Sequence, residues 1–197
     1  MNVYDFDKTI YDGDSSVDFY RYCVLRYPQI IRKAPRQAAA VVCYGLGRIT
    51  KTQMKQALFA YMALLPDTLR AAEDFWSTHR ERIKTWYIVQ KREDDVIISA
   101  SPRFLLSFVC PNLIASEVNP KDGTYCGINC RGEEKVRRFR ELYADAKIEN
   151  FYSDSFADTP LAIVSEKAFL VKGDKIIPWP EAELKNALHA RNSDREV

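Results

Sequence analysis

The sequence predicts an α/β protein with a doubly wound, mostly parallel sheet and a helical cap inserted after the first strand. Three observations lead to this prediction. Short apolar runs that end at polar or glycine-containing corners recur along the chain, helical patterns lie between most of them, and one long helical stretch interrupts the alternation. Strands that are buried on both faces and alternate with helices are typical of a parallel sheet covered on each side.

Five apolar runs are the expected strands. Most of their residues are aliphatic, aromatic or β-branched, and such residues favour strands over loops. The runs are NVYDF at 2–6, DVIISAS at 95–101, NLIASEV at 112–118, ENFYSDS at 149–155 and KAFLVKG at 167–173.

Helices are expected in the segments that join these runs. The helical patterns lie at 102–110, 133–146 and 158–166. Segment 119–132 contains Asp122-Gly123, a pair typical of tight turns, and predicts a hairpin. The tail at 189–197 is expected to be frayed.

The long helical stretch covers residues 16–90. Apolar and aromatic residues recur in it at helical spacing, with breaks at Pro28, Pro35, Gly45, Gly47 and Pro66. At 197 residues, the chain is long enough for one domain that carries such an insertion. We therefore expect a core formed by residues 1–15 and 91–197 and a helical cap formed by residues 16–90.

The composition is that of a globular protein, with 47% hydrophobic and 28% charged residues. A formal charge of +2 gives no bias toward nucleic acid, so no nucleic-acid partner is expected. The five cysteines form no C-x-x-C pair, which indicates neither a disulfide framework nor a zinc site and suits a reducing cytosol. The start MNVYDF lacks the pattern of a secretory signal, and the apolar stretch at 38–47 is about half the length of a spanning helix. We expect a cytoplasmic protein.

Basic residues gather in the cap. No Asp or Glu occurs between Asp18 and Asp67, whereas eight Lys and Arg do: Arg21, Arg26, Arg32, Lys33, Arg36, Arg48, Lys51 and Lys55. This local positive charge suits either the capture of a small anionic substrate or contact with an anionic membrane surface.

Polar side chains follow the expected strands at their carboxyl ends, where ligands of an open parallel sheet collect. They are Asp5 and Asp7 after the first strand, Ser99 after the second, Lys135 at the helix start that follows the hairpin, and Asp154 with Asp158 after the fourth. Carboxylates gathered in one place need a divalent cation, and ligands that are all oxygen favour Mg²⁺.

Each of these residues also has a plainer explanation. Asp5 and Asp7 suit an ordinary turn, Ser99 suits a helix cap and Lys135 suits a solvated helix face. Asp154 and Asp158 suit the cap of the next helix. Their occurrence together, in order and at strand ends, favours one common site.

In this order the motifs resemble those of the haloacid dehalogenase-like superfamily. D-x-D-x-T is matched by residues 5–9, the apolar run ending in Ser by VIIS at 96–99, the Lys by Lys135, and D-x-x-x-D by DSFAD at 154–158. The resemblance covers nearly the whole chain and implies a Rossmann-like core. The insertion lies where the phosphoserine phosphatase-like branch places its helical cap.

The resemblance implies a phosphatase mechanism. Asp5 is then the nucleophile, which forms an aspartyl-phosphate, and Asp7 protonates the leaving oxygen and later deprotonates water. Dehalogenases of this superfamily lack the second acid, so Asp7 favours phosphate ester hydrolysis. Mg²⁺ is implied between the Asp5 carboxylate, the Asp7 backbone carbonyl and Asp154.

The remaining motif residues are implied to hold the phosphate. Lys135 and Ser99 contact the transferring oxygens, and Thr9 and Ala100 belong to the same phosphate-binding set. Asp158 orients either a metal-bound water or Lys135.

Three residues depart from the pattern or extend it. Lys8 stands where many relatives have Gly, and Ala100 stands where phosphoserine phosphatases commonly have Gly. Asp14 has the spacing of an acid that binds a substrate ammonium group, but it also suits an ordinary helix cap.

The substrate is open between two classes. We expect a small soluble phosphorylated metabolite. The alternative is a lipid phosphate at the inner membrane face, because segment 21–49, with NLIAS, GEEKV and YSDSFADTPL, resembles bacterial phosphatidylglycerophosphate phosphatases and combines basic with apolar residues. A second alternative is a non-catalytic phosphate-binding module.

Overall fold

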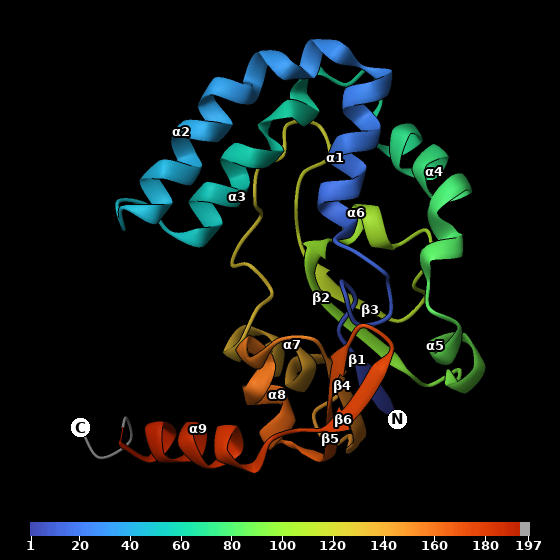
Figure 1. Ribbon diagram of the computed structural model, residues 1–197, viewed down its shortest axis with the longest axis vertical. Coiled ribbons are helices and arrows are strands. Elements are labelled where there is room, and N and C mark those ends of the chain that lie inside the picture. Colours follow the sequence, from blue (N-terminus) through green and yellow to red (C-terminus); the bar gives the residue numbers. More distant parts are fainter. Residues whose placement is uncertain (194–197) are drawn as a thin grey trace.

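The computed structural model describes residues 1–193 and contains one six-stranded sheet (Figure 1). The strands are β1 (Asn2–Tyr4), β2 (Val96–Pro102), β3 (Leu113–Ser116), β4 (Ile148–Ser153), β5 (Ser165–Lys172) and β6 (Lys175–Pro178). Their order is β3-β2-β1-β4-β5-β6, and only the edge strand β6 runs antiparallel to its neighbour. The predicted α/β fold with a mostly parallel sheet is confirmed.

Successive residues of the buried strands supply two separate cores, one on each face of the sheet. Val3 and Phe151 belong to the core on the side of α7 (Glu133–Leu142), α8 (Thr159–Ile163) and α9 (Glu181–Ser193). Their neighbours Tyr4 and Tyr152 stack with ring centroids 4.9 Å apart in the core on the other face. Side chains that alternate in this way need cover on both faces, which explains the apolar strand sequences.

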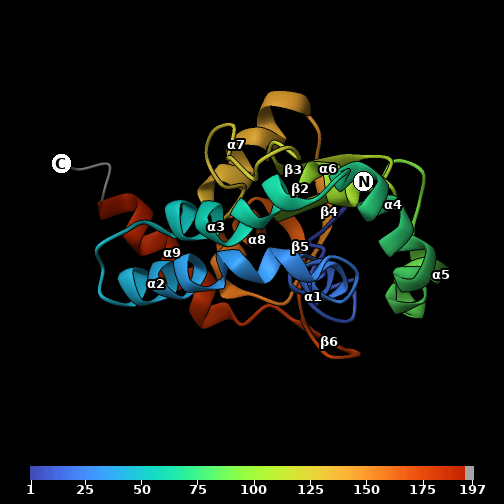
Figure 2. The same cartoon turned by 90° about the horizontal axis from the view of Figure 1, so that it is seen from above.

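The regular elements between β1 and β2 are all helices. Its elements are α1 (Ser15–Arg26), η1 (Pro28–Lys33), α2 (Ala34–Gly45), α3 (Lys51–Phe59), η2 (Ala60–Leu64), α4 (Thr68–His79), η3 (Arg80–Arg82) and α5 (Thr85–Gln90). Figures 1 and 2 both show α2 and α3 side by side, and Figure 1 places them opposite α7 to α9. We keep the name cap for residues 16–90, and its status as a separate domain stays a prediction.

Local sequence explains where the helices of the cap begin. Asp14 caps α1 by accepting a hydrogen bond from the backbone N of Val17 at 3.0 Å. Thr50 and Gln53 form a reciprocal capping box at the start of α3. Such caps satisfy backbone donors that the first helical turn leaves without partners.

The two segments that join the cap to the core run side by side. The backbone N of Asp12 donates to Arg82 O at 2.8 Å, and the backbone N of Lys84 donates to Ile10 O at 2.8 Å. The Arg82 guanidinium also pairs with Asp18 at 2.6 Å. The segments that enter and leave the cap are therefore joined to each other beside the end of β1.

Several elements differ from the sequence prediction. The helix expected at 102–110 is only α6 (Arg103–Leu106), and the one expected at 158–166 ends early because β5 begins at Ser165. The hairpin expected at 119–132 has a single isolated bridge, between Val118 and Tyr125. The strand β6 and the helix α9 were not predicted.

The tail expected to be frayed lies partly outside the described residues, since α9 extends to Ser193 and the structure describes nothing beyond it. All five cysteines are free thiols. Within residues 1–193, no helix combines the length and the apolar character needed to cross a membrane.

Candidate active site

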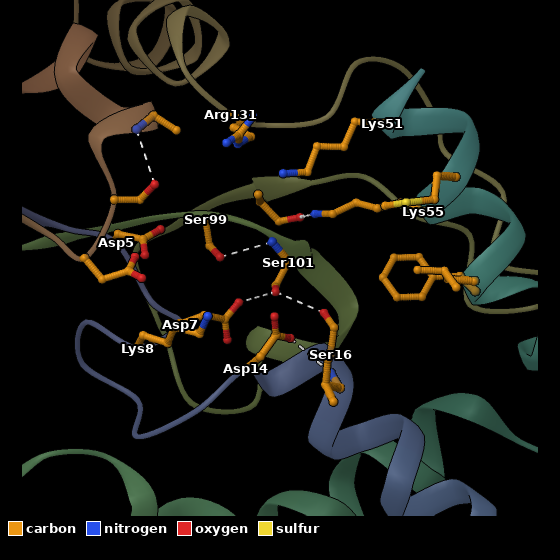
Figure 3. A pocket seen from close by; sticks show the side chains of 18 of the residues that line it. Asp5, Asp7, Lys8, Asp14, Ser16, Lys51, Lys55, Ser99, Ser101 and Arg131 are labelled. Atoms are coloured by element: carbon orange, nitrogen blue, oxygen red, sulfur yellow. Dashed lines mark hydrogen bonds between the residues drawn. The ribbon is translucent and has the colours of Figure 1, made fainter. Parts of the chain in front are cut away.

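The topology creates a crevice at the carboxyl end of β1. This strand lies between β2 and β4. The sheet continues through β2 to β3 on one side of β1 and through β4 to β5 on the other, so the strand order reverses direction at β1. Such a switch point is where open α/β sheets bind ligands. A cavity of about 490 Å³ lies here, between the strand ends and the cap (Figure 3).

Asp5 lies at the bottom of this cavity in a buried ion-pair chain. The Lys135 ammonium donates to Asp5 Oδ1 at 2.7 Å and to Asp158 Oδ2 at 2.7 Å. Ser153 donates to the same oxygen of Asp158 at 2.8 Å. Lys135 is only 1% exposed, so the first helical turn of α7 delivers its amine to two carboxylates that come from different strand ends.

Burial and ion pairing act in opposite directions on Asp5 and Lys135, and burial prevails only for Asp5. It raises the pKa of Asp5 to about 7, although the charge of Lys135 acts in the opposite direction. Burial also acts to lower the pKa of Lys135, but the charges of Asp158 and Asp5 outweigh it and raise that pKa. Lys135 therefore remains a cation, and Asp5 needs further positive charge to be fully ionised at neutral pH.

Thr9 connects the ends of β1 and β4. Its buried hydroxyl donates to Asp5 Oδ2 at 3.2 Å and accepts a hydrogen bond from the backbone N of Asp154 at 2.9 Å. Thr9 does not line the cavity. In this structure its contacts hold the two acids beside each other, and the implied contact with phosphate stays a prediction.

The carboxylate of Asp7 is fixed by two donors. Ser101 donates to Asp7 Oδ2 at 2.5 Å, and the backbone N of Ser15 donates to Oδ1 at 2.7 Å. Burial, with the charge of Asp14, raises the pKa of Asp7 to about 6, and the two hydrogen bonds only partly offset this. A carboxylic acid with a raised pKa that is held in one place suits proton donation near neutral pH.

Ser99 and Ala100 lie where the regular pairing of β2 with β3 breaks down. The register shifts between Ser99 and Pro102, and both Ser99 and Ala100 line the cavity. The hydroxyl of Ser99 accepts a hydrogen bond from the backbone N of Ser101 at 3.1 Å, which leaves its own proton to donate. The Ala100 carbonyl accepts from Lys55 at 3.0 Å.

Lys8 and Asp14 have clear local roles. Lys8 adopts a positive φ of 59°, a conformation that Gly reaches without strain, and its carbonyl accepts a hydrogen bond from the Lys84 ammonium at 3.0 Å. Asp14 is the cap of α1 and also lines the cavity. The interpretation of Asp14 as a helix cap is therefore confirmed, and its contact with a substrate ammonium group stays a prediction.

The implied Mg²⁺ can be tested against the donors that are present. Burial raises the pKa of Asp154, and no side chain within residues 1–193 donates a hydrogen bond to its carboxylate. The backbone carbonyl of Asp7 likewise accepts no hydrogen bond from any described residue. The described part of the chain contains no group of three His, Cys, Asp or Glu side chains arranged to hold a metal.

These observations fit a hard cation that keeps several waters. Asp5 and Asp154 supply two carboxylates, Asp7 supplies a carbonyl, and Mg²⁺ usually binds through one or two carboxylates with water in its other positions. A cation there would also offset the unfavourable burial of Asp5 and Asp154.

The structure brings Asp5, Lys135 and Asp158 into direct contact and joins Asp154 to Asp5 through Thr9. Ser99 and Ala100 line the same cavity as Asp5 and Asp7.

The sequence analysis missed Ser101, although it lies two residues after Ser99. It also gave Lys51, Lys55 and Arg131 no place in the site, and all three line the cavity. The basic stretch of the cap was a signal for the two lysines, but sequence spacing does not show which of eight cations face inward.

Three comparisons with known proteins add to this geometry. A family model described as haloacid dehalogenase-like hydrolase matches residues 3–162. A search of curated proteins finds no match.

Solved structures share the fold at low identity. A protein with unknown function from Bordetella pertussis Tohama I is 20% identical at a TM-score of 0.67, with 98% of this chain and 95% of that chain covered. A phosphoserine phosphohydrolase-like protein from Francisella tularensis is 16% identical at a TM-score of 0.54, with 95% and 100% covered. A probable phosphoserine phosphatase from Vibrio cholerae is 12% identical at 0.56, with 98% and 66% covered. Because the family model matches most of the chain, the chain belongs to the haloacid dehalogenase-like hydrolases.

Proposed function

We propose that the protein hydrolyses phosphate monoesters through an aspartyl-phosphate on Asp5, with Mg²⁺ as cofactor. The observation that carries this proposal is the chain of contacts around Asp5. Lys135 bonds Asp5, and the second acid, Asp7, is held at the same cavity by Ser101. A nucleophile, a permanent cation and a fixed proton donor are the groups that phosphoryl transfer requires.

The first half of the reaction forms a bond between a carboxylate oxygen of Asp5 and phosphorus while the bond to the leaving oxygen breaks. Asp7 gives its proton to that oxygen, so the alcohol leaves neutral. Lys135 holds positive charge beside the phosphoryl oxygens, and Ser99 donates its free hydroxyl proton to one of them. In the second half, Asp7 takes a proton from water, which attacks phosphorus and releases Asp5 and inorganic phosphate.

Mg²⁺, held by Asp5, Asp154 and the Asp7 carbonyl, would neutralise charge between the Asp5 carboxylate and the incoming phosphate. Asp158 acts through Lys135, because it shares the ammonium with Asp5. Thr9 keeps Asp5 and Asp154 beside each other.

The direct test uses p-nitrophenyl phosphate and the purified protein with Mg²⁺. Asp5→Asn should abolish turnover, and Asp174→Asn, at an exposed turn outside the cavity, should leave it unchanged. Brief incubation with a ³²P-labelled ester and acid quenching should trap labelled wild-type protein and no labelled Asp5→Asn. Hydrolysis by Asp5→Asn within about tenfold of wild type would remove Asp5 as nucleophile. Binding of phosphate without any turnover would favour the non-catalytic module.

We propose a small soluble phosphate ester as substrate and a cytoplasmic location. A second candidate, hydrolysis of a lipid phosphate at an anionic membrane, is favoured by one observation on α2. Four large apolar side chains at the end of α2 and just after it are exposed, among them Val42 at 61% and Leu46 at 62%. The basic residues Arg32, Lys33 and Arg36 precede them in the chain, and such a mixture suits the surface of an anionic bilayer.

A further inference from the structure

Besides Lys8 and Lys135, three cations that belong to none of the four motifs line the cavity. Lys51 and Lys55 lie one turn apart on α3, and Arg131 lies two residues before α7. Figure 3 shows both lysine side chains extending from α3 toward the strand ends, with Arg131 near the end of Lys51. The mechanism proposed above uses none of them.

None of these cations contacts a carboxylate in the part of the chain whose side chains the structure describes, residues 1–188. Lys55 donates to two neutral acceptors, Ala100 O at 3.0 Å and Asn129 Oδ1 at 3.3 Å. Among residues 1–188, no salt bridge joins Lys51, Lys55 or Arg131 to a carboxylate. Asp7 and Asp14 attract Lys55 from across the cavity, but Asp7 is bonded to Ser101 and Asp14 caps α1.

Burial and repulsion from a neighbouring cation lower the pKa of both lysines. Burial, and then the charge of Lys51, lower the pKa of Lys55 to about 8. Burial, and then the charge of Arg131, lower the pKa of Lys51. Like charges held near one another without a carboxylate in direct contact destabilise each other, and the carboxylates across the cavity offset this only in part, so an anionic ligand group would be bound favourably beside the three cations.

A purely structural role accounts for only part of this pattern. The two hydrogen bonds of Lys55 join the cap to the core, and a neutral side chain such as Gln supplies the same donors. They do not explain why Lys51 and Arg131 line the same cavity. The cavity volume of about 490 Å³ also falls in the range of sites for whole small molecules and exceeds the need of a single phosphate.

We propose that the substrate is a phosphate monoester whose leaving group carries a second phosphate group, bound by Lys51, Lys55 and Arg131. The inference rests on the proposed function for the first phosphate. A second phosphate fits better than a carboxylate, because three cations match its larger charge and its additional acceptor oxygens. Only the phosphate at Asp5 is transferred, and the second leaves unchanged with the alcohol.

Apolar residues of the cap line the same cavity, including Met54, Leu58 and Phe59 on α3. They suit a carbon segment between the two phosphates. The shared chemistry occurs in soluble bisphosphates and in phospholipid headgroups that end in a phosphate monoester.

The first test measures binding, without turnover, by calorimetry in EDTA. The matched ligands are 1,3-propanediol bisphosphate and propyl phosphate. We expect the second phosphate to increase the affinity of the wild-type protein at least tenfold. Lys55→Gln, which keeps the hydrogen-bond donors but not the charge, should lose most of this gain, and so should Arg131→Gln.

Lys175→Gln is the control, because Lys175 is exposed on β6 and does not line the cavity. It should keep the full gain, and thermal melting should show that all variants are folded. A wild-type gain below threefold, or a gain that survives both Lys55→Gln and Arg131→Gln, would overturn the second phosphate site.

The second test compares hydrolysis of 1,3-propanediol bisphosphate with that of a phospholipid carrying a terminal phosphate monoester in mixed micelles, both in Mg²⁺. Preference for either one over propyl phosphate supports the inference, and the better of the two identifies the source. A binding gain without hydrolysis of any ester would contradict the proposed function while leaving the second phosphate site supported.

Discussion

Ser101 donates a hydrogen bond of 2.5 Å to the carboxylate of Asp7, although 94 positions separate the two residues in the sequence. The contact connects the irregular end of β2 to the loop after β1, and the backbone N of Ser15, at the start of α1, donates to the other carboxylate oxygen of Asp7. A residue that holds the proposed proton donor should affect catalysis most where the leaving group needs protonation.

Ser101→Ala should therefore lower kcat on an alkyl phosphate by about tenfold or more, a part of the 10²–10⁴ that general acid catalysis contributes. The effect on p-nitrophenyl phosphate should be smaller, because p-nitrophenolate leaves without a proton. Steady-state kinetics on both esters measure the difference. Ser107→Ala, at an exposed position after α6, is the control. Equal losses on the two esters would show that Ser101 does not act through Asp7.

Removal of Mg²⁺ should stop the hydrolysis of phosphate esters. EDTA should abolish hydrolysis and excess Mg²⁺ should restore it, because Asp5 and Asp154 place unneutralised charge where phosphate must bind. Asp154→Ala should raise the Mg²⁺ concentration required for half-maximal activity by about tenfold or more. Full activity after exhaustive chelation would reject the metal, and an unchanged Mg²⁺ requirement in Asp154→Ala would reject that ligand.

Lys135 should be essential for both stability and activity. Its removal leaves Asp5 and Asp158 buried without their cation, and breaking a buried ion pair in this way costs about 3–5 kcal/mol. Lys135→Met should lower the free energy of unfolding in urea accordingly and abolish turnover. The double variant Lys135→Met with Asp158→Asn should recover part of the stability and none of the activity. Equal stability of the two variants would show that the Asp158 charge is not the source of the loss.

The metal-free protein should lose stability as the pH rises from about 4 to about 7. The pKa values of Asp5 and Asp7, about 7 and about 6, lie above those of carboxyl groups in an unfolded chain. The folded protein therefore keeps protons that the unfolded chain has released in this range, so the free energy of unfolding falls with pH. Urea unfolding in EDTA measures the slope.

A matched variant isolates the contribution of the nucleophile. Asp5→Asn removes one of the two carboxyl groups and should make the slope shallower. Mg²⁺ should also raise the melting temperature more at about pH 8 than at about pH 5, where protons compete for Asp5. An identical slope in wild type and Asp5→Asn would contradict the raised pKa of Asp5.

Contact with a membrane should be weak and sensitive to salt. Exposed basic residues near an anionic bilayer contribute on the order of 1 kcal/mol each, and salt at about 0.1 M screens them beyond about 10 Å. We expect modest sedimentation with phosphatidylglycerol-containing vesicles at low salt, reduced by Val42→Ser and by neutralising Arg32 and Lys33 together. Neutralising Lys172 and Lys175 on the β5–β6 hairpin is the control. Tight binding with preferential hydrolysis of phosphatidylglycerophosphate would favour the lipid substrate.

The parts of the fold that the sequence predicted are those set by short-range pattern. The runs around Val3, Ile98 and Phe151 are buried on both faces, and this burial requires the apolar residues that marked them as strands. The strand β6 was missed because KIIP is short and exposed at the edge of the sheet, where no core selects its residues. The short helix α8 is limited by the strand β5 that begins at Ser165, which helical periodicity does not report.

The candidate site shows the same division. The sequence predicted that Asp5, Asp7, Lys135 and Asp158 lie together because of their places relative to strands and helix starts, and all four line one cavity, while their roles stay a prediction. The contact of Ser101 with Asp7 could not be predicted, because it depends on the register shift at the end of β2. The inward direction of Lys55 could not be predicted either, because it depends on the packing of α3 against the strand ends. Contacts of this kind depend on how closely the cap packs against the core, and a single sequence does not give the distance between the two.

The entry and exit segments of the cap form its attachment to the core, where the backbone N of Asp12 donates to Arg82 O and the backbone N of Lys84 donates to Ile10 O. Residues near this attachment and residues farther along the cap differ in how freely they can change. Ser15 lies close to this attachment and takes part in holding Asp7, so changes near it disturb the chemistry itself. The helices α2 and α3 lie farther along the inserted chain and contribute Lys51 and Lys55. New substrates are therefore reached most easily by replacing residues 34–59 as a unit, and a chimera that exchanges this segment with a relative should change the preferred ester while still hydrolysing p-nitrophenyl phosphate.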